Sequence, residues 1–169
     1  MRSTPIDPPA APLSDGVVAV RLRRDADLTI IAAARHDPDS RRWLDDAPQD
    51  APPRSADALA EMWRRGEAAP MVIADAASDE PLGLINVQFR SDEEATVAYQ
   101  VFGSRRGRGT AGRALELVAG WCFRDLGLCR LLLEIDPANT ASLRVAEKCG
   151  FTEIEPAAGP KIVFVRGRA

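Results

Sequence analysis

The stretch Arg106-Gly107-Arg108-Gly109-Thr110-Ala111 lies where the hydrophobic pattern of the sequence changes its period. Before it, residues 95–102 are rich in β-forming side chains. After it, apolar residues recur at the i, i+3, i+4, i+7 spacing over 111–126, which is typical of a helix with one buried face. The stretch is therefore predicted to be a loop that joins a strand to a helix.

The start of that helix is predicted to bind phosphate. Backbone N–H groups in the first turn of a helix lack partners within the helix, and the helix dipole is positive there. Gly107 and Gly109 let the backbone approach an anion closely, and the neighbouring arginines add positive charge. A ligand with a pyrophosphate group suits such a loop.

The segments on either side predict an α/β domain. Three β-rich runs at 71–76, 82–89 and 95–102 are separated by short polar links, which favour an antiparallel meander. Residues 129–135 are mostly apolar, as in a strand buried on both faces, and a short helix over 140–149 follows. The predicted sheet is mixed, with an antiparallel half joined to a βαβ half of parallel character.

The remaining segments complete the predicted order β-α-α-β-β-β-α-β-α-β-β. Residues 1–15 are rich in proline and alanine and are expected to form a flexible tail, so that one domain spans 16–169. The other expected elements are a strand over 17–22, a helix over 25–34, a helical piece near Trp43 and Leu44, a proline-rich loop over 47–54, a helix capped by Ser55, and strands over 151–154 and 161–166.

Composition limits the classes of function. The chain has 169 residues, a formal net charge of -3 and a sequence pI near 5.3, which argues against nucleic acid as a main partner. Neither a membrane span nor a secretory signal is recognisable, so we expect a cytoplasmic protein. Three cysteines and the single His36 suggest neither a disulfide framework nor a metal site.

A dinucleotide site is one alternative interpretation of the loop. Gly107-x-Gly109-x-x-Gly112 matches the dinucleotide-binding fingerprint, and Glu134 lies about where an acidic ribose ligand is expected. That fingerprint belongs to a parallel, doubly wound sheet, whereas here it follows an antiparallel meander. The context therefore disfavours this alternative.

Two motifs resemble the GNAT acetyltransferase family. Residues 106–111 resemble its acyl-CoA loop, Arg/Gln-x-x-Gly-x-Gly/Ala. Residues 139–151, which read Asn-Thr-Ala-Ser-Leu-Arg-Val-Ala-Glu-Lys-Cys-Gly-Phe, are similar to the Asn-x-x-Ser…Glu-Lys-x-Gly-Phe pattern of the branch that acetylates ribosomal-protein N-termini. The resemblance covers the chain outside the N-terminal tail.

This resemblance implies an N-acetyltransferase that uses acetyl-CoA and no metal. In the family, the strand before the loop splays from the next parallel strand, and acyl-CoA lies in the wedge. By this likeness, the backbones of Tyr99 and Val101 would pair with pantetheine, and backbone N–H groups from Arg106 to Ala111 would hold the pyrophosphate. Asn139 would bond the pantetheine arm or order the site near the thioester, and Ser142 would lie near the CoA sulfur.

The chain also departs from the family pattern. Many relatives carry a tyrosine acid on the last helix, where this chain has Ala146, so Ser142 is the expected substitute. Gly103 replaces a frequent proline, and Arg113 replaces a frequent glutamate. No general base stands out, and the candidates by location are Glu93, Glu94, Glu134 and Asp136.

Several alternatives stay open at this level. Asn139 and Ser142 are also residue types that cap helices, so each has a purely structural interpretation. The acceptor would be a protein N-terminus or a small-molecule amine, bound by the segment 35–65. A non-catalytic acyl-CoA-binding module is the alternative function. Homodimers are common in the family.

Overall fold

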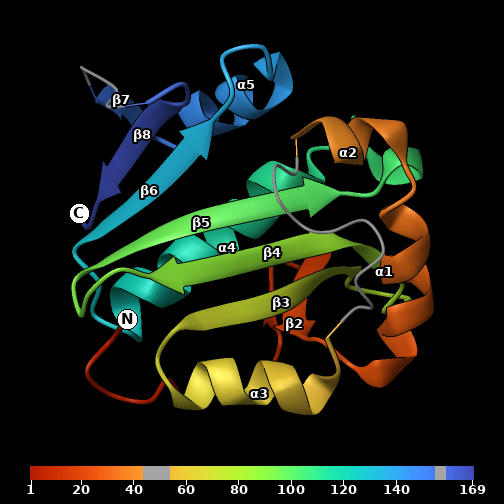
Figure 1. Cartoon of the computed structure of the whole chain (residues 1–169), viewed down its shortest axis with the longest axis horizontal. Coiled ribbons are helices and arrows are strands. Elements are labelled where there is room, and N and C mark those ends of the chain that lie inside the picture. Colours follow the sequence, from red (N-terminus) through yellow and green to blue (C-terminus); the bar gives the residue numbers. More distant parts are fainter. Residues whose placement is uncertain (44–53, 155–158) are drawn as a thin grey trace.

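The computed structural model describes residues 1–43, 54–154 and 159–169, and its centre is one mixed sheet (Figure 1). The strand order is β1-β2-β3-β4-β5-β6-β8-β7. The strands are β1 (Leu13–Ser14), β2 (Val18–Leu22), β3 (Ala68–Asp75), β4 (Pro81–Phe89), β5 (Glu94–Val101), β6 (Arg130–Ile135), β7 (Thr152–Ile154) and β8 (Ile162–Gly167).

Pairing in the sheet is antiparallel from β1 to β5, and β5 then pairs with β6 in parallel. Beyond β6, the strands β8 and β7 pair antiparallel again. The mixed α/β sheet is thus confirmed, and its parallel character rests on one strand pair among the described strands. The connection between these two strands contains the loop and the helix identified in the sequence.

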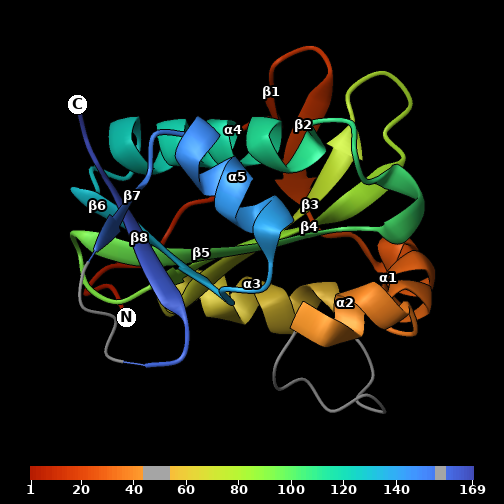
Figure 2. The ribbon, with the colours of Figure 1, turned by 90° about the horizontal axis from the view of Figure 1, so that it is seen from above.

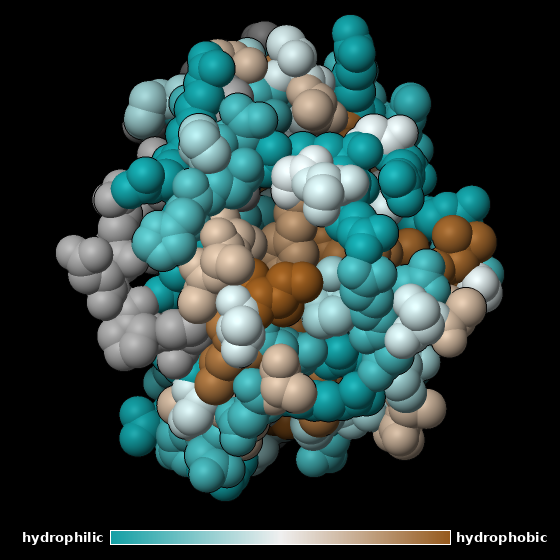
Figure 3. All heavy atoms as spheres, turned by 90° about the vertical axis from the view of Figure 1, so that its right-hand side faces the viewer, coloured by the Kyte–Doolittle hydropathy of each residue, from teal (hydrophilic) through white to brown (hydrophobic). Residues whose placement is uncertain are grey.

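Helices cover both faces of the sheet (Figure 2). One face carries α4 (Thr110–Arg124) and α5 (Thr140–Lys148), and the other carries α1 (Leu28–Ala34), α2 (Pro38–Trp43) and α3 (Ala56–Arg64). The 3-10 turns η1 (Asp25–Asp27) and η2 (Gly103–Arg105) precede α1 and α4. The surface on the α1 side is mostly hydrophilic, with hydrophobic residues gathered near the middle of the view (Figure 3).

Side-chain alternation along the strands builds the main core beneath α4. Ile85 and Val87 of β4 and Val97 of β5 are buried on the same face as Leu115 and Val118 of α4. Burying each such side chain contributes about 1.5–3 kcal/mol relative to exposure. The period-2 and period-3.6 patterns of the sequence therefore meet in one apolar layer.

Most predicted elements occur within a few residues of their expected bounds, and the differences are informative. The strand over 129–135 is buried on one face only: Leu131 and Leu133 are buried, whereas Arg130 and Glu134 are exposed. The expectation of burial on both faces is therefore wrong. The predicted helix over 25–34 divides into η1 and α1. Leu44 and most of the predicted proline-rich loop lie outside the described residues.

The N-terminal segment, expected to be a flexible tail, makes contacts with the domain. Ile6 is buried in the main core, and its N–H donates to the Trp63 carbonyl at 3.1 Å. The Met1 ammonium donates to the Phe89 carbonyl at 2.7 Å. Proline-rich composition predicted mobility, but one isoleucine and these hydrogen bonds hold the segment against α3 and β4.

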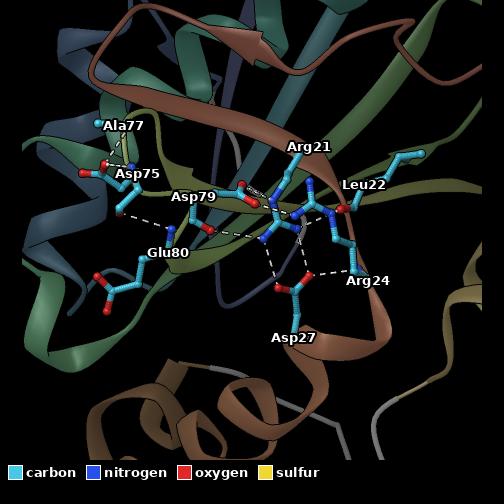
Figure 4. Close-up of polar contacts among 9 residues, drawn as sticks. Arg21, Leu22, Arg24, Asp27, Asp75, Ala77, Asp79 and Glu80 are labelled. Carbon is cyan, nitrogen blue, oxygen red and sulfur yellow. Dashed lines mark hydrogen bonds and ion pairs between the residues drawn. The ribbon is translucent and has the colours of Figure 1, made fainter.

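A buried ion pair fixes the corner between β2, the β3–β4 hairpin and η1 (Figure 4). The Arg21 guanidinium donates to both oxygens of Asp27, at 2.9 and 3.0 Å, and through Nε to Asp79 at 2.7 Å. Arg21 and Asp27 are both buried. The network ties β2 to the segment that leads into α1 and α2.

Candidate functional site

The parallel strands β5 and β6 diverge toward their C-terminal ends. They pair only between residues 94–96 and 130–132. Beyond these residues, β5 continues to Val101 along β4, and β6 continues to Ile135 along β8. Figure 1 shows β6 turning away from β5. The divergence leaves one backbone edge of residues 97–101 without a described strand partner, beside the glycine-rich loop.

The predicted phosphate loop lies at the start of α4 as expected. Gly107 and Gly109 have φ values of +77° and +74°, which are left-handed conformations that favour glycine. Gly109 is the residue that caps α4, a helix of 15 residues. A Cβ atom at either glycine would meet nothing within 4 Å. The backbone of the loop is therefore open to a ligand on the side where those Cβ atoms would project.

Arg106 takes a different role from the one expected of a charge aimed at phosphate. Its Nη2 donates to Asp37 at 3.0 Å, its Nη1 donates to Asp39 at 3.1 Å, and its Nε donates to the Val101 carbonyl at 3.1 Å. The guanidinium thus joins the loop to α2 and to the end of β5. Its backbone N–H donates to the Gly103 carbonyl at a long 3.5 Å.

Arg108 differs from Arg106 in its partners. Among the residues that the structure describes, none forms an ion pair with it. With Arg105 and Thr110 it lines a cavity of about 110 Å³ beside the loop. A larger cavity of about 410 Å³ lies between residues 9–12 and β2, away from the loop, and we assign it no role in the site.

Tyr99 lies in the middle of the diverging part of β5. Its side chain points to the α4 and α5 face, and its hydroxyl is buried without a hydrogen-bond partner. Burial raises the pKa of Tyr99 to about 12, and the neighbouring Ser142 side chain opposes this rise. Burying a hydroxyl without a hydrogen-bond partner costs about 1–3 kcal/mol of folding free energy. A ligand that bonds to the Tyr99 hydroxyl would offset this cost.

The two residues from the second motif begin α5. Asn139 is its N-cap, and the side-chain oxygen of Asn139 accepts from the Ser142 N–H at 3.2 Å. The capping interpretation of Asn139 is therefore correct for its side chain in this structure. Ser142 and Ala146 are four residues apart and share one helix face. Ala146 is fully buried, so α5 carries a hydroxyl at position 142 and a buried methyl group one turn later.

The four carboxylates named as candidate bases are not brought together. Glu93 and Glu94 lie at the start of β5, roughly 23 Å from Val101 for a strand of this length. Glu94 pairs with Arg130 at 2.8 Å, and Glu134 pairs with Arg90 at 2.5 Å. Asp136 follows β6 at the loop end of the wedge, where it accepts from the Ala138 N–H at 2.8 Å.

Two amide side chains that the sequence analysis missed lie on the opposite face of the same strands. Asn86 Oδ1 of β4 and Gln100 Nε2 of β5 are buried without hydrogen-bond partners. The available signal was the presence of amide side chains inside two β-rich runs, Asn86 and Gln88 in the first and Gln100 in the second, but the sequence does not tell which of them is buried. Polar side chains at such positions need a partner, because burial without one is unfavourable.

Other site classes have no support among the described ranges. Within 1–43, 54–154 and 159–169, no group of three or more His, Cys, Asp or Glu side chains is placed to hold a metal ion. In the same ranges, no helix is long and apolar enough to cross a membrane. Cys122, Cys129 and Cys149 are free thiols.

A family model for the acetyltransferase (GNAT) domain matches residues 18–152. Comparison with proteins of curated function finds no match.

Solved structures with the same fold include three acetyltransferases. One, assigned as a ribosomal-protein-serine acetyltransferase of Vibrio cholerae, has 21% identity and a TM-score of 0.79 over 95% of this chain and 99% of its own. RimJ of Mycobacterium smegmatis, in complex with CoA-disulfide, has 23% identity and a TM-score of 0.75 over 93% and 86%. Spermidine N-acetyltransferase of Vibrio cholerae, in complex with CoA and spermine, has 17% identity and a TM-score of 0.71 over 91% and 97%.

Proposed function

The chain belongs to the GNAT acetyltransferase family, and from this premise we propose that it transfers the acetyl group of acetyl-CoA to a primary amine. The observation that carries the proposal is the divergence of β5 from β6 beside an open, glycine-rich helix start. The divergence leaves backbone edges for an extended ligand, and the helix start offers N–H groups for a pyrophosphate.

The residues present fit acetyl-CoA as the donor. Backbone N–H groups of residues 106–111 would hold the pyrophosphate, and the backbone edge at Tyr99 and Val101, which β6 does not pair with, would pair with the pantetheine arm. Asn139 would order the start of α5 beside the thioester. When bound, acetyl-CoA supplies the acetyl group as an activated thioester.

The proposed reaction has four parts. The neutral nitrogen of the acceptor amine attacks the thioester carbonyl, so that a C–N bond forms and the C–S bond breaks. A backbone N–H at the end of β5, near Val101, polarises the carbonyl. The amine gives up a proton to water or to a carboxylate such as Asp136. Ser142, with the unpaired Tyr99 hydroxyl beside it, supplies a proton to the leaving thiolate.

The class of acceptor divides into a protein N-terminus and a small-molecule amine, and structural neighbours named for each type share the fold. The alternative function is an acyl-CoA-binding module without turnover. Ala146 at the position of the usual tyrosine favours this alternative, as do the ion pairs that already engage Glu94 and Glu134.

Thermal unfolding with acetyl-CoA, free CoA and NADH is the first test. Binding to the native state increases the free energy of unfolding, by about 2.7 kcal/mol at a ligand concentration of one hundred times the Kd. The unfolding midpoint therefore rises. A rise with both CoA species and not with NADH supports the donor site. Release of free CoA with an amine then separates an enzyme from a binding module. If neither acetyl-CoA nor free CoA raises the midpoint, the proposal is wrong.

A further inference from the structure

Unpaired polar atoms concentrate where β5 leaves β6. Among the described residues, five buried side-chain atoms have no hydrogen-bond partner, and three of them lie at the diverging end of β5 or on β4 beside it. The five are Arg2 Nε, Arg23 Nε, Asn86 Oδ1, Tyr99 Oη and Gln100 Nε2. Buried polar atoms are normally paired. We therefore infer that a bound ligand supplies the missing hydrogen-bond partners of this cluster.

The cluster divides between the two faces of the sheet. Tyr99 points to the face of α4 and α5, which is the donor side proposed above. Asn86 lies opposite Ala98, and Gln100 is two residues along β5, so both amides point to the face covered by α1, α2 and α3 (Figure 2). Ala98, which lies opposite Asn86 and two residues before Gln100, is exposed. The surface of β5 beside the two amide side chains, called the floor below, is therefore accessible to a ligand.

The two unpaired atoms complement one chemical group. Asn86 Oδ1 accepts a hydrogen bond, and Gln100 Nε2 donates one. Diagonal neighbours on adjacent strands are close enough to contact the same group. A peptide residue in an extended conformation carries its N–H donor and its carbonyl acceptor on the same side of the backbone, and it can satisfy both atoms. A protonated polyamine carries donors only, and it would leave Gln100 Nε2 unpaired.

Charge on this face points the same way. A polyamine site requires carboxylates available to a cation. Three carboxylates in the described part of this face already have arginine partners: Glu134 is paired with Arg90, and Asp37 and Asp39 are paired with Arg106. These carboxylates are largely neutralised by arginine. The described part of the face therefore suits an acceptor that is recognised by hydrogen bonds more than by positive charge.

We propose that Asn86 and Gln100 bind the N–H and the carbonyl of one backbone residue of the acceptor, so that the substrate is an amine followed by a peptide backbone, as at the N-terminus of a peptide. The inference rests on the proposed acetyltransfer and assigns its acceptor side. The two amides act on specificity: they position the acceptor over the exposed floor of β5 and take no part in proton transfer.

The test compares two acceptors with matched variants. Asn86→Leu and Gln100→Met remove the polar atoms and keep most of the volume. The acceptors are a mixture of peptides with a randomised N-terminal residue, and spermidine. We expect kcat/KM for the peptides to fall by roughly ten- to a hundredfold in each variant, as for the loss of one or two hydrogen bonds. The rate with spermidine should stay low and change less than threefold.

Two controls keep the outcome interpretable. Gln88→Met alters an exposed amide on the same face of β4 and should leave peptide acetylation unchanged. The thermal shift with acetyl-CoA should be the same in all variants, because the donor side is separate. Loss of that shift in the wild-type protein would defeat the acetyltransferase proposal itself. With the shift intact, the inference is overturned by equal losses for both acceptors, by unchanged peptide rates, or by acetylation of spermidine alone or of neither acceptor.

Discussion

The guanidinium of Arg106 donates a hydrogen bond to the carboxylate of Asp37 at 3.0 Å, across 69 positions of sequence. A Cβ atom at Gly103 would lie 3.2 Å from the same carboxylate, so the close approach of α2 to the loop favours the glycine found there. The loop proposed to bind the donor is therefore in direct contact with the segment that begins α2.

Arg106→Gln should loosen this contact without unfolding the protein. Both partners are about one-third exposed, and such a pair contributes at most about 1 kcal/mol. We expect the Kd for CoA to rise by roughly three- to tenfold, because the loop must be ordered when the ligand binds. Calorimetric titration with CoA measures this. Arg64→Gln, which breaks an exposed pair with Glu61 on α3, is the control, and an equal change in Kd there would contradict the assignment.

Gly109→Ala should abolish most donor binding. Gly109 has φ of +74° at the start of α4, and Gly127 has φ of +69° just after α4. A Cβ at either position would meet nothing within 4 Å. Alanine should therefore cost each variant about 1–2 kcal/mol of backbone strain. Only at Gly109 does the new methyl group enter the space predicted for the pyrophosphate.

Thermal unfolding of both glycine variants, with and without acetyl-CoA, separates the two effects. Their midpoints without ligand should fall by a similar few degrees. The shift caused by acetyl-CoA should persist in Gly127→Ala and largely disappear in Gly109→Ala. Equal shifts in the two variants would mean that the loop does not contact the donor.

Tyr99→Phe should separate stability from turnover. Removal of an unpaired buried hydroxyl relieves its desolvation, so the variant should be as stable as the wild type or more stable by about 1 kcal/mol. Acetyl-CoA should still raise the midpoint, while kcat falls if the hydroxyl helps Ser142 to protonate the thiolate. Single-turnover kinetics of Tyr99→Phe, Ser142→Ala and the double variant would reveal whether the two hydroxyls act together. An unchanged kcat in the double variant would exclude both as proton donors.

The alkaline stability of the same variant carries a second prediction. Burial raises the pKa of Tyr99 to about 12, whereas the unfolded chain should lose this proton near pH 10. The unfolded state therefore ionises first, and the contribution to stability that is complete below pH 10 is lost as the pH rises toward 12. Burial also raises the pKa of Cys122 to about 12, so the wild type alone is not diagnostic. Denaturant unfolding between pH 9 and 12 should show a smaller loss for Tyr99→Phe.

How much the sequence could predict depended on the range of the interactions involved. The apolar stripe of α4 and the cap at Ser55, whose side chain accepts from the Ala58 N–H at 3.3 Å, are local patterns, and both were predicted correctly. The partners of Arg106 were not predictable, because Asp37 and Asp39 lie more than sixty positions away. Nothing in the pattern of β5 marks where β6 leaves it, since period-2 alternation encodes the face of a side chain and not its neighbouring strand.

The candidate site follows the same division. The glycine conformations at the start of α4 follow from composition, and they occur where the motif lies. The unpaired atoms of Asn86, Tyr99 and Gln100 emerge only when strands, helices and loops are assembled, because burial is a property of the whole fold. Ile6 was missed for that reason too: a single apolar residue in a proline-rich segment has no periodicity to reveal that it is buried.

Asp27→Ala should be the most destabilising substitution considered. It leaves the buried Arg21 guanidinium without its bidentate partner, and removing one member of a buried pair costs about 3–5 kcal/mol. Asp79 also pairs with Arg21 at 2.7 Å but is half exposed, so it compensates only in part. Urea unfolding at neutral pH measures the loss. Asp92→Ala, which removes an exposed partner of Ser3, should change stability by less than about 1 kcal/mol.

The pH dependence of this pair tests the same assignment without ligand. Burial alone would raise the pKa of Asp27, but hydrogen bonds from Arg21 and from the Arg24 N–H outweigh it and lower the pKa. A carboxylate with a lowered pKa contributes stability above its ordinary value near 3.9, and that contribution is lost as the pH falls through the lowered value. Wild-type stability should therefore decline below about pH 4, and the Asp27→Ala variant should decline less steeply. Parallel acid limbs for the two proteins would show that Asp27 does not carry the charge that Arg21 requires.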